Sequence, residues 1–331
     1  NIDSASVVIE NVVLQNNSLS GAKVFDSRYV EFYNLSSSTN GQAGVLPEDL
    51  AGLTYIESND VESNSGDVRC NNCTIFDNLG SGIYVEDSVD LWIENSHIFN
   101  NSESHPAIIV DSEGLASVPG MFHILDSSVW SNRTSGNGYG IEFVNADGEV
   151  DGLTVNGQND GIYWEGRTLP SQTETSIISN ISISNTNGTA CLILKDHTYI
   201  TGNNLVLNDD CSGLFYVDSS QANFSSSSFA NSVYVSNSST LRLRSPDLSR
   251  VNLQNAVIEP QSKIQLAFDM QIWAINNRSN GIPSTFLNLS FSDFGSGRRQ
   301  NWWVPGFNLV NLEVFVFGSI LTALKLRSGP S

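Results

Sequence analysis

The sequence predicts an all-β protein whose main part is a right-handed parallel β-helix, a solenoid of short stacked strands. Three observations favour this fold. Strand-like segments recur along the 331 residues, turns rich in Asn and Gly separate them, and only 15% of the residues are charged. Ser and Asn fill the polar positions instead, and both compete with helical backbone hydrogen bonds and favour turns.

The recurring segments alternate apolar and polar side chains, which places Ile, Val, Leu and Phe on one face of each strand. The first segments of successive repeats are residues 82–87, 106–111, 140–145, 161–166, 190–195, 213–218 and 232–237. A second segment follows, as in 89–95 and 198–204, and then a third, as in 96–101 and 205–210. Their starts lie roughly 20 to 35 residues apart, which fits one coil of three short strands.

The Asn content is explained by the corners of such a coil. Tight corners need left-handed backbone conformations, which Asn and Gly tolerate best. Asn side chains at equivalent corners can also hydrogen-bond along the axis. We expect corners at Asn100, Asn101, Asn185, Asn203, Asn204 and Asn208, and inserted loops at 35–53, 112–120 and 166–175.

These degenerate repeats resemble the pectate-lyase-like family of right-handed β-helix proteins, over roughly residues 1–255. We therefore assign residues 1–257 to the β-helix. The pattern then changes. Longer strands are predicted at 263–275 and 285–291, with a turn at 280–284 between them. Residues 258–300 are interpreted as a β-strand cap or a truncated β-sandwich module, because a solenoid needs its last coil covered.

The tail, residues 301–331, resembles the archaeal sorting signal that archaeosortases process. Its Pro305-Gly306-Phe307 tripeptide precedes an apolar stretch and then Lys325 and Arg327. The resemblance implies export and anchoring. Residues 307–326 are about long enough for a helix crossing a ~30 Å hydrocarbon core. The alternative is a soluble strand at 309–317 followed by a short helix.

Charge and cysteine content limit the environment and the partners. The net charge is −20, with a pI near 4.3, which argues against nucleic acid and is compatible with cations. The four cysteines favour two disulfides or buried thiols over a zinc site, although Cys70 and Cys73 have ligand spacing. Several Asn-X-Ser/Thr sequons permit glycosylation of an extracellular protein.

Two acidic clusters are candidates for chemistry. Asp209 and Asp210 precede Cys211 between two strands, and this segment resembles the Asp-Asp-Cys segment of polygalacturonase-like hydrolases. The other motifs of that family are missing, so an acidic corner is the competing interpretation. Asp147, Glu149 and Asp151 partly match a calcium loop. Here the competing interpretation is a solvated turn.

Aromatic residues on successive coils offer a binding role. Tyr84, Trp92, Tyr163 and Trp164 are the candidates for stacking on sugar rings. Inward packing is the alternative, and adjacent strand residues such as Tyr163 and Trp164 must point in opposite directions.

Together these features favour an exported cell-surface protein with an adhesive, structural or glycan-binding role. The partners would be a polysaccharide or surface glycan, and the membrane through the C-terminal tail. No cofactor is required, and calcium is the candidate ion. The alternative is a polysaccharide lyase or glycoside hydrolase that acts on acidic polysaccharides through surface carboxylates, so an enzymatic role stays open.

Overall fold

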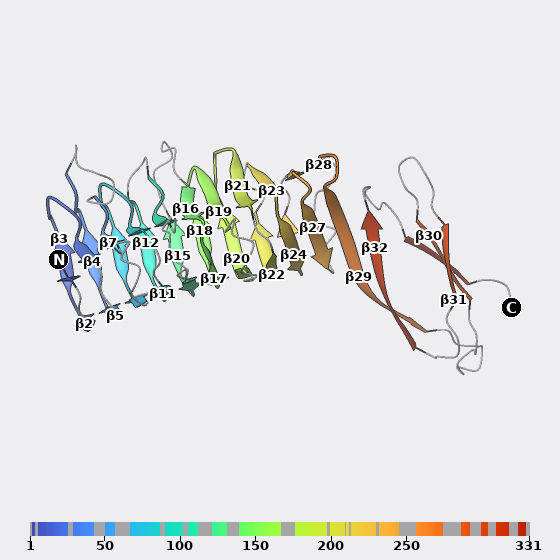
Figure 1. Ribbon diagram of the computed structural model, residues 1–331, viewed down its shortest axis with the longest axis horizontal. Coiled ribbons are helices and arrows are strands. Elements are labelled where there is room, and N and C mark those ends of the chain that lie inside the picture. The colour runs from blue at the N-terminus through green and yellow to red at the C-terminus, as the bar shows by residue number, and fades with distance from the viewer. Residues whose placement is uncertain are drawn as a thin grey trace.

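A computed structural model of the protein shows a rod of stacked coils with further strands at its C-terminal end (Figure 1). The structure describes residues 2–3, 6–25, 29–42, 50–56, 67–86, 90–101, 105–111, 121–130, 139–166, 176–196, 199–208, 210–211, 213–229, 232–244, 256–273, 286–291, 299–303, 309–317 and 324–328.

Each coil contributes one strand to an 11-stranded parallel sheet, which we call the first sheet. These first strands begin where the repeats predicted them, so the central prediction of the sequence is confirmed. They are β1 (Ile2–Asp3), β4 (Ala22–Phe25), β7 (Leu53–Ile56), β10 (Ile83–Glu86), β13 (Ile108–Asp111), β16 (Tyr139–Val144), β19 (Asp160–Glu165), β21 (Ala190–Lys195), β23 (Leu214–Asp218), β26 (Val233–Ser236) and β28 (Val257–Ile258).

The second and third strands of each coil belong to a 19-stranded sheet that bends at a corner between them. The second strands are β2 (Ser6–Glu10), β5 (Tyr29–Tyr33), β8 (Asp67–Asn71), β11 (Asp90–Glu94), β14 (Met121–Leu125), β17 (Asp147–Asp151), β24 (Gln221–Ser225) and β27 (Thr240–Arg244). The third strands are β3 (Val13–Gln15), β6 (Ser36–Ser38), β9 (Thr74–Phe76), β12 (His97–Phe99), β15 (Ser128–Trp130), β18 (Thr154–Asn156) and β25 (Ser228–Phe229). In two coils one long strand supplies both, namely β20 (Ser176–Ser184) and β22 (Ile200–Leu207).

The core runs along the inside of the rod. Alternate residues of every coil point inward, so that in β10 Ile83 and Val85 are fully buried. Large aromatic rings fill the middle coils, where Phe122 and Phe143 stack with centroids 3.8 Å apart. Because each coil pairs in register with the next, like side chains lie on like ones for the length of the core.

Asparagine organises the corners, as the sequence predicted. Asn100, Asn185 and Asn204 adopt left-handed conformations, with φ near 51°. Side-chain amides also bond from coil to coil, for example from Asn185 Nδ2 to Asn156 Oδ1 at 2.9 Å. Asn101 and Asn203 lie beside these corner residues without a positive φ of their own, and Asn208 has none either.

A second asparagine ladder lies inside the rod. The Oδ1 atom of Asn40 accepts from Asn17, that of Asn78 accepts from Asn40, and that of Asn101 accepts from Asn78. Each of these amide-to-amide bonds is 2.8 or 2.9 Å long. The ladder satisfies buried polar groups that would otherwise destabilise the stack.

Glycine precedes several first strands because neighbouring coils approach closely there. A Cβ atom at Gly161 would lie 2.0 Å from the carbonyl oxygen of Cys191 in the next coil. The recurring Gly at the start of the repeats is therefore a packing requirement.

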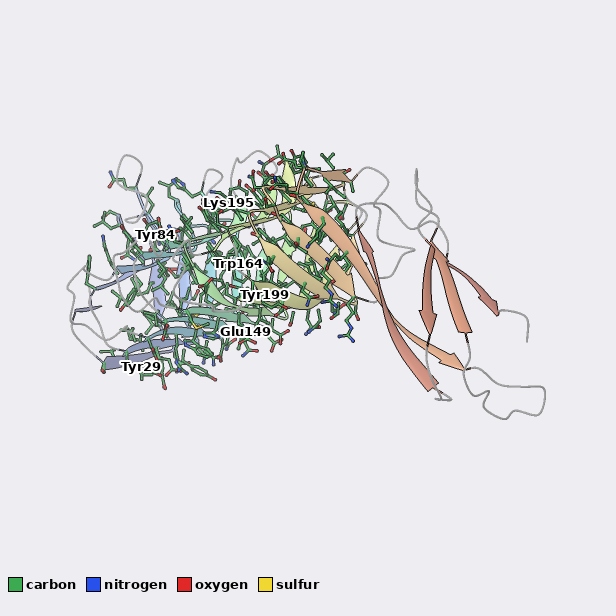
Figure 2. The ribbon with its side chains drawn as sticks, turned by 45° about the vertical axis from the view of Figure 1, so that its right-hand side comes forward. Tyr29, Tyr84, Glu149, Trp164, Lys195 and Tyr199 are labelled. Atoms are coloured by element: carbon green, nitrogen blue, oxygen red, sulfur yellow. A yellow bond between two sulfur atoms is a disulfide. The ribbon has the colours of Figure 1, made fainter. Side chains whose placement is uncertain are left out.

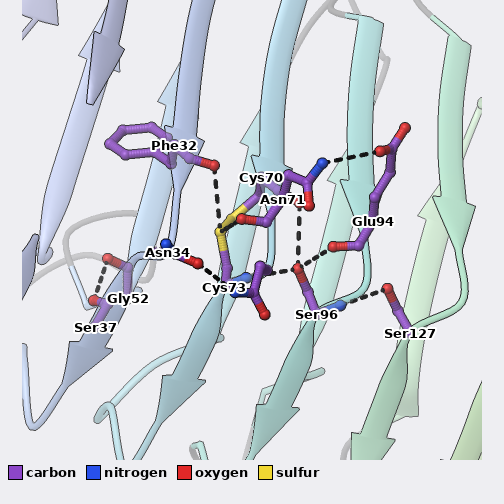
Figure 3. The surroundings of a disulfide bond; sticks show 11 residues. Phe32, Asn34, Ser37, Gly52, Cys70, Asn71, Cys73, Glu94, Ser96 and Ser127 are labelled. Carbon is purple, nitrogen blue, oxygen red and sulfur yellow. Dashed lines mark hydrogen bonds between the residues drawn. A yellow bond between two sulfur atoms is a disulfide. The ribbon is translucent and has the colours of Figure 1, made fainter. Parts of the chain in front are cut away.

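All four cysteines form disulfides, Cys70 with Cys73 and Cys191 with Cys211, and all four are buried. The zinc alternative for Cys70 and Cys73 is wrong. Cys70 is the penultimate residue of β8 and Cys73 directly precedes β9, so this disulfide crosses the corner between them (Figure 3). The Ser96 hydroxyl of the adjacent coil accepts from the Cys73 amide at 3.0 Å.

The loop predicted at 35–53 is shorter than expected. Residues 35–42 and 50–53 belong to the coil, since β6 lies within them and Leu35 and Leu50 are buried. Serine at all positions of β6 removes the apolar alternation that would have indicated a strand. The other predicted loops, apart from Gly166, lie outside the described residues.

At the C-terminal end the parallel stacking continues past the expected boundary at residue 257. The strand β29 (Lys263–Trp273) pairs with β27 through residue 267 and then runs on to pair antiparallel with β32 (Leu309–Phe317). A separate antiparallel sheet contains β30 (Phe286–Phe291), β31 (Arg299–Trp303) and β33 (Leu324–Ser328). The strands predicted at 263–275 and 285–291 are thus present.

The tail differs from the helix expected over 307–326, because β32 and β33 occupy most of that range. The strand alternative at 309–317 matches β32. Val310, Leu312, Val314 and Val316 alternate there with Asn311 and Glu313, a pattern that favours a strand. Among the described residues no helix is long and apolar enough to cross a membrane. The Pro305-Gly306-Phe307 tripeptide lies outside the described residues.

Candidate functional site

The outward side of the first sheet, which we call the first-sheet face, carries tyrosines and carboxylates in register. In β10, β19 and β23 a Tyr and an acidic residue alternate with a buried residue. The register between strands places the tyrosines in one column and the acidic residues in the next, with other residues, such as Ile109 and Ile193, in the coils between them. The pairs are Tyr84 with Glu86, Tyr163 with Glu165, and Tyr216 with Asp218.

At the centre of this face, Glu165 joins a tyrosine to a lysine. The Tyr163 hydroxyl donates to Glu165 Oε2 at 2.6 Å, and Lys195 Nζ donates to Glu165 Oε1 at 2.9 Å. Burial and the bond to Glu165 raise the pKa of Tyr163 to about 12. The same carboxylate raises the pKa of Lys195 above its ordinary value. Both groups therefore stay protonated at neutral pH and act as hydrogen-bond donors.

Farther along, a second network holds the next pair of tyrosines. The Tyr216 and Tyr234 rings lie 5.0 Å apart at a tilt of 42°. Ser236 Oγ hydrogen-bonds the Tyr216 hydroxyl at 3.0 Å and Asp218 Oδ1 at 2.9 Å, and the Tyr234 hydroxyl donates to Glu259 Oε1 at 2.6 Å. These bonds fix the hydroxyl ends of the rings, so the aromatic groups are held in place before any ligand arrives.

Glu142 has the most unusual carboxyl on the face. It pairs in register with Ile109 on one side and Tyr163 on the other. Burial raises the pKa of Glu142, and the nearby charges of Asp111 and Glu165 raise it further. A carboxyl of this kind retains its proton to higher pH than an ordinary glutamate, which is the property of a general acid.

The four predicted aromatic residues are divided among three places. Tyr84 and Tyr163 lie on the first-sheet face. Trp92 lies on the second strands, where its ring stacks on His123 at 3.8 Å and has the Arg69 guanidinium 4.9 Å from its centroid. Trp164 is only 1% exposed, and its Nε1 donates to the Ala146 carbonyl at 2.8 Å.

Trp164 therefore has no surface to offer a ligand, because the strand turns it inward when Tyr163 points outward. The prediction that one member of this pair faces solvent is confirmed, and Tyr163 is that member. Figure 2 shows Tyr84 and Lys195 on one side of the rod, Tyr29 and Glu149 on the other, and Trp164 between them.

The predicted catalytic pair does not form a described site. Asp209 lies outside the described residues, and Asp210 is exposed at a corner. There Asp210 Oδ1 accepts from the Asn185 amide of the neighbouring coil at 3.0 Å. This bond ties Asp210 to the neighbouring coil.

The three carboxylates proposed for calcium are spread along β17, each with its own partner. Asp147 accepts from Ser176 at 3.3 Å, Glu149 lies 3.5 Å from His123 Nδ1, and Asp151 accepts from Asn180 at 2.7 Å. In the part of the chain that the structure describes, no group of three or more His, Cys, Asp or Glu could hold a metal ion. A strand separates such side chains by about 6.6 Å, whereas a calcium loop folds them together.

The comparison with protein families agrees with this architecture. The family model described as "Right handed beta helix region" matches residues 1–118. The parallel pairing of the strands continues the same arrangement beyond that segment. The chain thus folds as a parallel β-helix, and the matched segment is of the right-handed kind. No curated protein and no solved structure matched it.

Three members of this face, Glu142, Glu165 and Asp218, were not predicted from the sequence. A signal was present, because Tyr-x-acid recurs at the same position of three repeats. Spacing of two residues puts both side chains on one side of a strand. Glu142 carries no such signal, since its partner Tyr163 belongs to the next coil.

Proposed function

We propose that this β-helix is an exported cell-surface protein that binds neutral glycans along its first-sheet face. The observation that carries the proposal is the Tyr-x-acid pair that recurs at the same position of three coils, β10, β19 and β23. Aromatic rings stack on the apolar faces of sugars, and carboxylates accept hydrogen bonds from sugar hydroxyls. A row of both along one axis suits a chain of sugar units.

The charge of the face favours a neutral ligand over an acidic one. Its described carboxylates include Glu86, Asp111, Glu165 and Asp218. Its described cations are Lys23 and Lys195, and Lys195 already bonds Glu165. A uronate polymer would meet repulsion unless a cation lay between. Calcium is therefore proposed only as a bridge to acidic glycans, which a binding assay with and without Ca²⁺ would reveal.

Extracellular placement is supported by the two disulfides, which form and persist in oxidising compartments. The sequons and the Pro305-Gly306-Phe307 tripeptide are consistent with export and envelope attachment. Attachment through the tail is part of the proposal. Cell fractionation of the wild type and of a Pro305→Ala, Gly306→Ala variant tests it, and equal retention in the membrane fraction would count against the sorting signal.

Affinity electrophoresis against soluble neutral glycans tests the binding face. Tyr84→Ala and Tyr216→Ala should each weaken binding about 2- to 12-fold, from ~0.5–1.5 kcal/mol per aromatic contact. Tyr199→Ala is the matched control, since Tyr199 is 41% exposed but lies at the start of a second strand. Equal losses in all three variants, or no retardation of the wild type by any glycan, would contradict the proposal.

A second candidate, a glycoside hydrolase, is favoured by the raised pKa of Glu142 beside Asp111. Glycosidases pair a protonated acid with an ionised carboxylate across the scissile bond. In this case Glu142→Gln should abolish the release of new reducing ends and leave glycan retention intact. Retention without any release by the wild type would leave the binding role and exclude this second one.

A further inference from the structure

The outward surface formed by the third strands, which we call the third-strand face, is uncharged. It comprises the outward residues of β3, β6, β9, β12, β15, β18 and β25, with residues 181–184 and 205–207 of β20 and β22. Among these described strand residues there is no Asp, Glu, Lys or Arg. Ser, Thr and Asn fill most of the outward positions, and His97 is the titratable group among them.

This neutrality stands out against the rest of the molecule. The whole chain carries a net charge of −20. The second strands present Glu31, Arg69 and Glu149 in one outward column, and the first-sheet face is rich in carboxylates. Two copies of so acidic a rod repel each other at most approaches. The third-strand face is where they can meet without placing like charges opposite one another.

An aromatic ridge runs along the same face. The Phe76 and Phe99 rings stack at 5.1 Å and 9°, and the Phe99 and Trp130 rings at 4.4 Å and 8°. Each ring covers the face of its neighbour, so the ridge presents ring edges outward. Sugar binding uses ring faces, whereas edges pack well against apolar and aromatic groups of another protein. The ridge therefore fits a protein partner better than a glycan.

We propose that the third-strand face is a lateral contact surface between copies of this chain. Stacked coils at about 4.8 Å each make the face about 40 Å long, and two outward columns make it about 10 Å wide. About 400 Å² per copy is half of the ~800 Å² typical of a stable interface. A single contact is therefore weak and reversible, and dense display on a surface would strengthen it by multivalency.

Sedimentation velocity of the full chain over a concentration series, in about 0.1 M and about 1 M salt, tests the proposal. The double variant His97→Glu, Thr154→Glu places two new carboxylates on the face at exposed positions. The matched control is Asn203→Glu, Gln221→Glu, which adds the same charge at exposed positions of the second strands.

The wild type and the control should self-associate, more strongly in high salt, because screening weakens the general repulsion. The His97→Glu, Thr154→Glu variant should associate at least tenfold more weakly at both salt concentrations. A wild type that stays monomeric in high salt overturns the proposal. Equal weakening of both doubles also overturns it, because net charge alone would then be responsible. Glycan retention by the first-sheet face is independent of either result.

Discussion

Replacing Asn78 by alanine should destabilise the N-terminal coils strongly, because Asn78 lies in the buried asparagine ladder and is 1% exposed. Its Oδ1 accepts from both the amide and the side chain of Asn40, at 3.1 and 2.9 Å. Its Nδ2 donates to the Ser37 carbonyl at 3.2 Å and to Asn101 Oδ1 at 2.8 Å. The substitution removes all of these side-chain bonds.

The expected loss follows from the net value of such bonds. At ~0.5–1.5 kcal/mol each, the bonds of the Asn78 side chain together contribute about 2–6 kcal/mol to the free energy of unfolding. We expect the free energy of unfolding to fall by about 4 kcal/mol, near the middle of this range, because alanine leaves the buried partners of Asn78 without a replacement. Water entering the space left by the amide would lower this value.

Urea unfolding followed by circular dichroism measures the change, and hydrogen exchange of residues 36–42 and 97–101 locates it. Local exchange matters because a solenoid can open a few coils at a time. Asn203→Ala is the control, since Asn203 is exposed and its side chain bonds Ser179 at the surface, and it should stay within about 0.5 kcal/mol of the wild type. A loss below about 1 kcal/mol for Asn78→Ala would refute the ladder as a source of stability.

Three further predictions concern the same rod. Removing the Cys191–Cys211 disulfide with serine at both positions should lower the free energy of unfolding by about 3 kcal/mol, because the bond closes a loop with a separation of 20 residues; an unchanged urea midpoint would contradict this. Gly161→Ala should cost about 1–3 kcal/mol, since its Cβ would collide with the Cys191 carbonyl, and thermal unfolding checks it. Glu142→Gln should raise stability relative to the wild type at neutral pH and leave it unchanged in acid. The folded pKa of Glu142 is raised by burial, so its stabilising contribution is complete below the unfolded pKa and is lost as the pH rises through the folded value. Urea midpoints across the pH range that do not diverge as the pH rises would argue against a buried carboxyl.

Local features of the fold were predictable because they depend on neighbours in sequence. The alternation in residues 82–87 and 161–166 identified strands β10 and β19, since a strand places every second side chain on one side. The left-handed corner at Asn185 was predictable as well, because few other residue types tolerate that backbone conformation. The disulfides were foreseen as a class, without their pairing.

The tail shows where such local reasoning fails. The composition of residues 307–326 satisfies the length and hydropathy of a membrane helix, yet β32 pairs along its length with β29, whose partner residues lie 36 to 52 positions earlier in the chain. The alternation of Asn311 and Glu313 with apolar residues was the signal for a strand. The sequence did not show, however, whether a partner strand would be available.

The sequence by itself determined the coil, its inward and outward residues and its corners, because these follow from steric preferences over a few residues. Only the tertiary structure decided which residues of different coils become neighbours. Adjacent members of the buried ladder are separated by 23 residues from Asn17 to Asn40 and by 38 from Asn40 to Asn78. Since inserted segments of unequal length separate the coils, the faces that carry Tyr163 with Glu165 and Phe99 with Trp130 emerge only when hydrogen bonding between coils fixes their register.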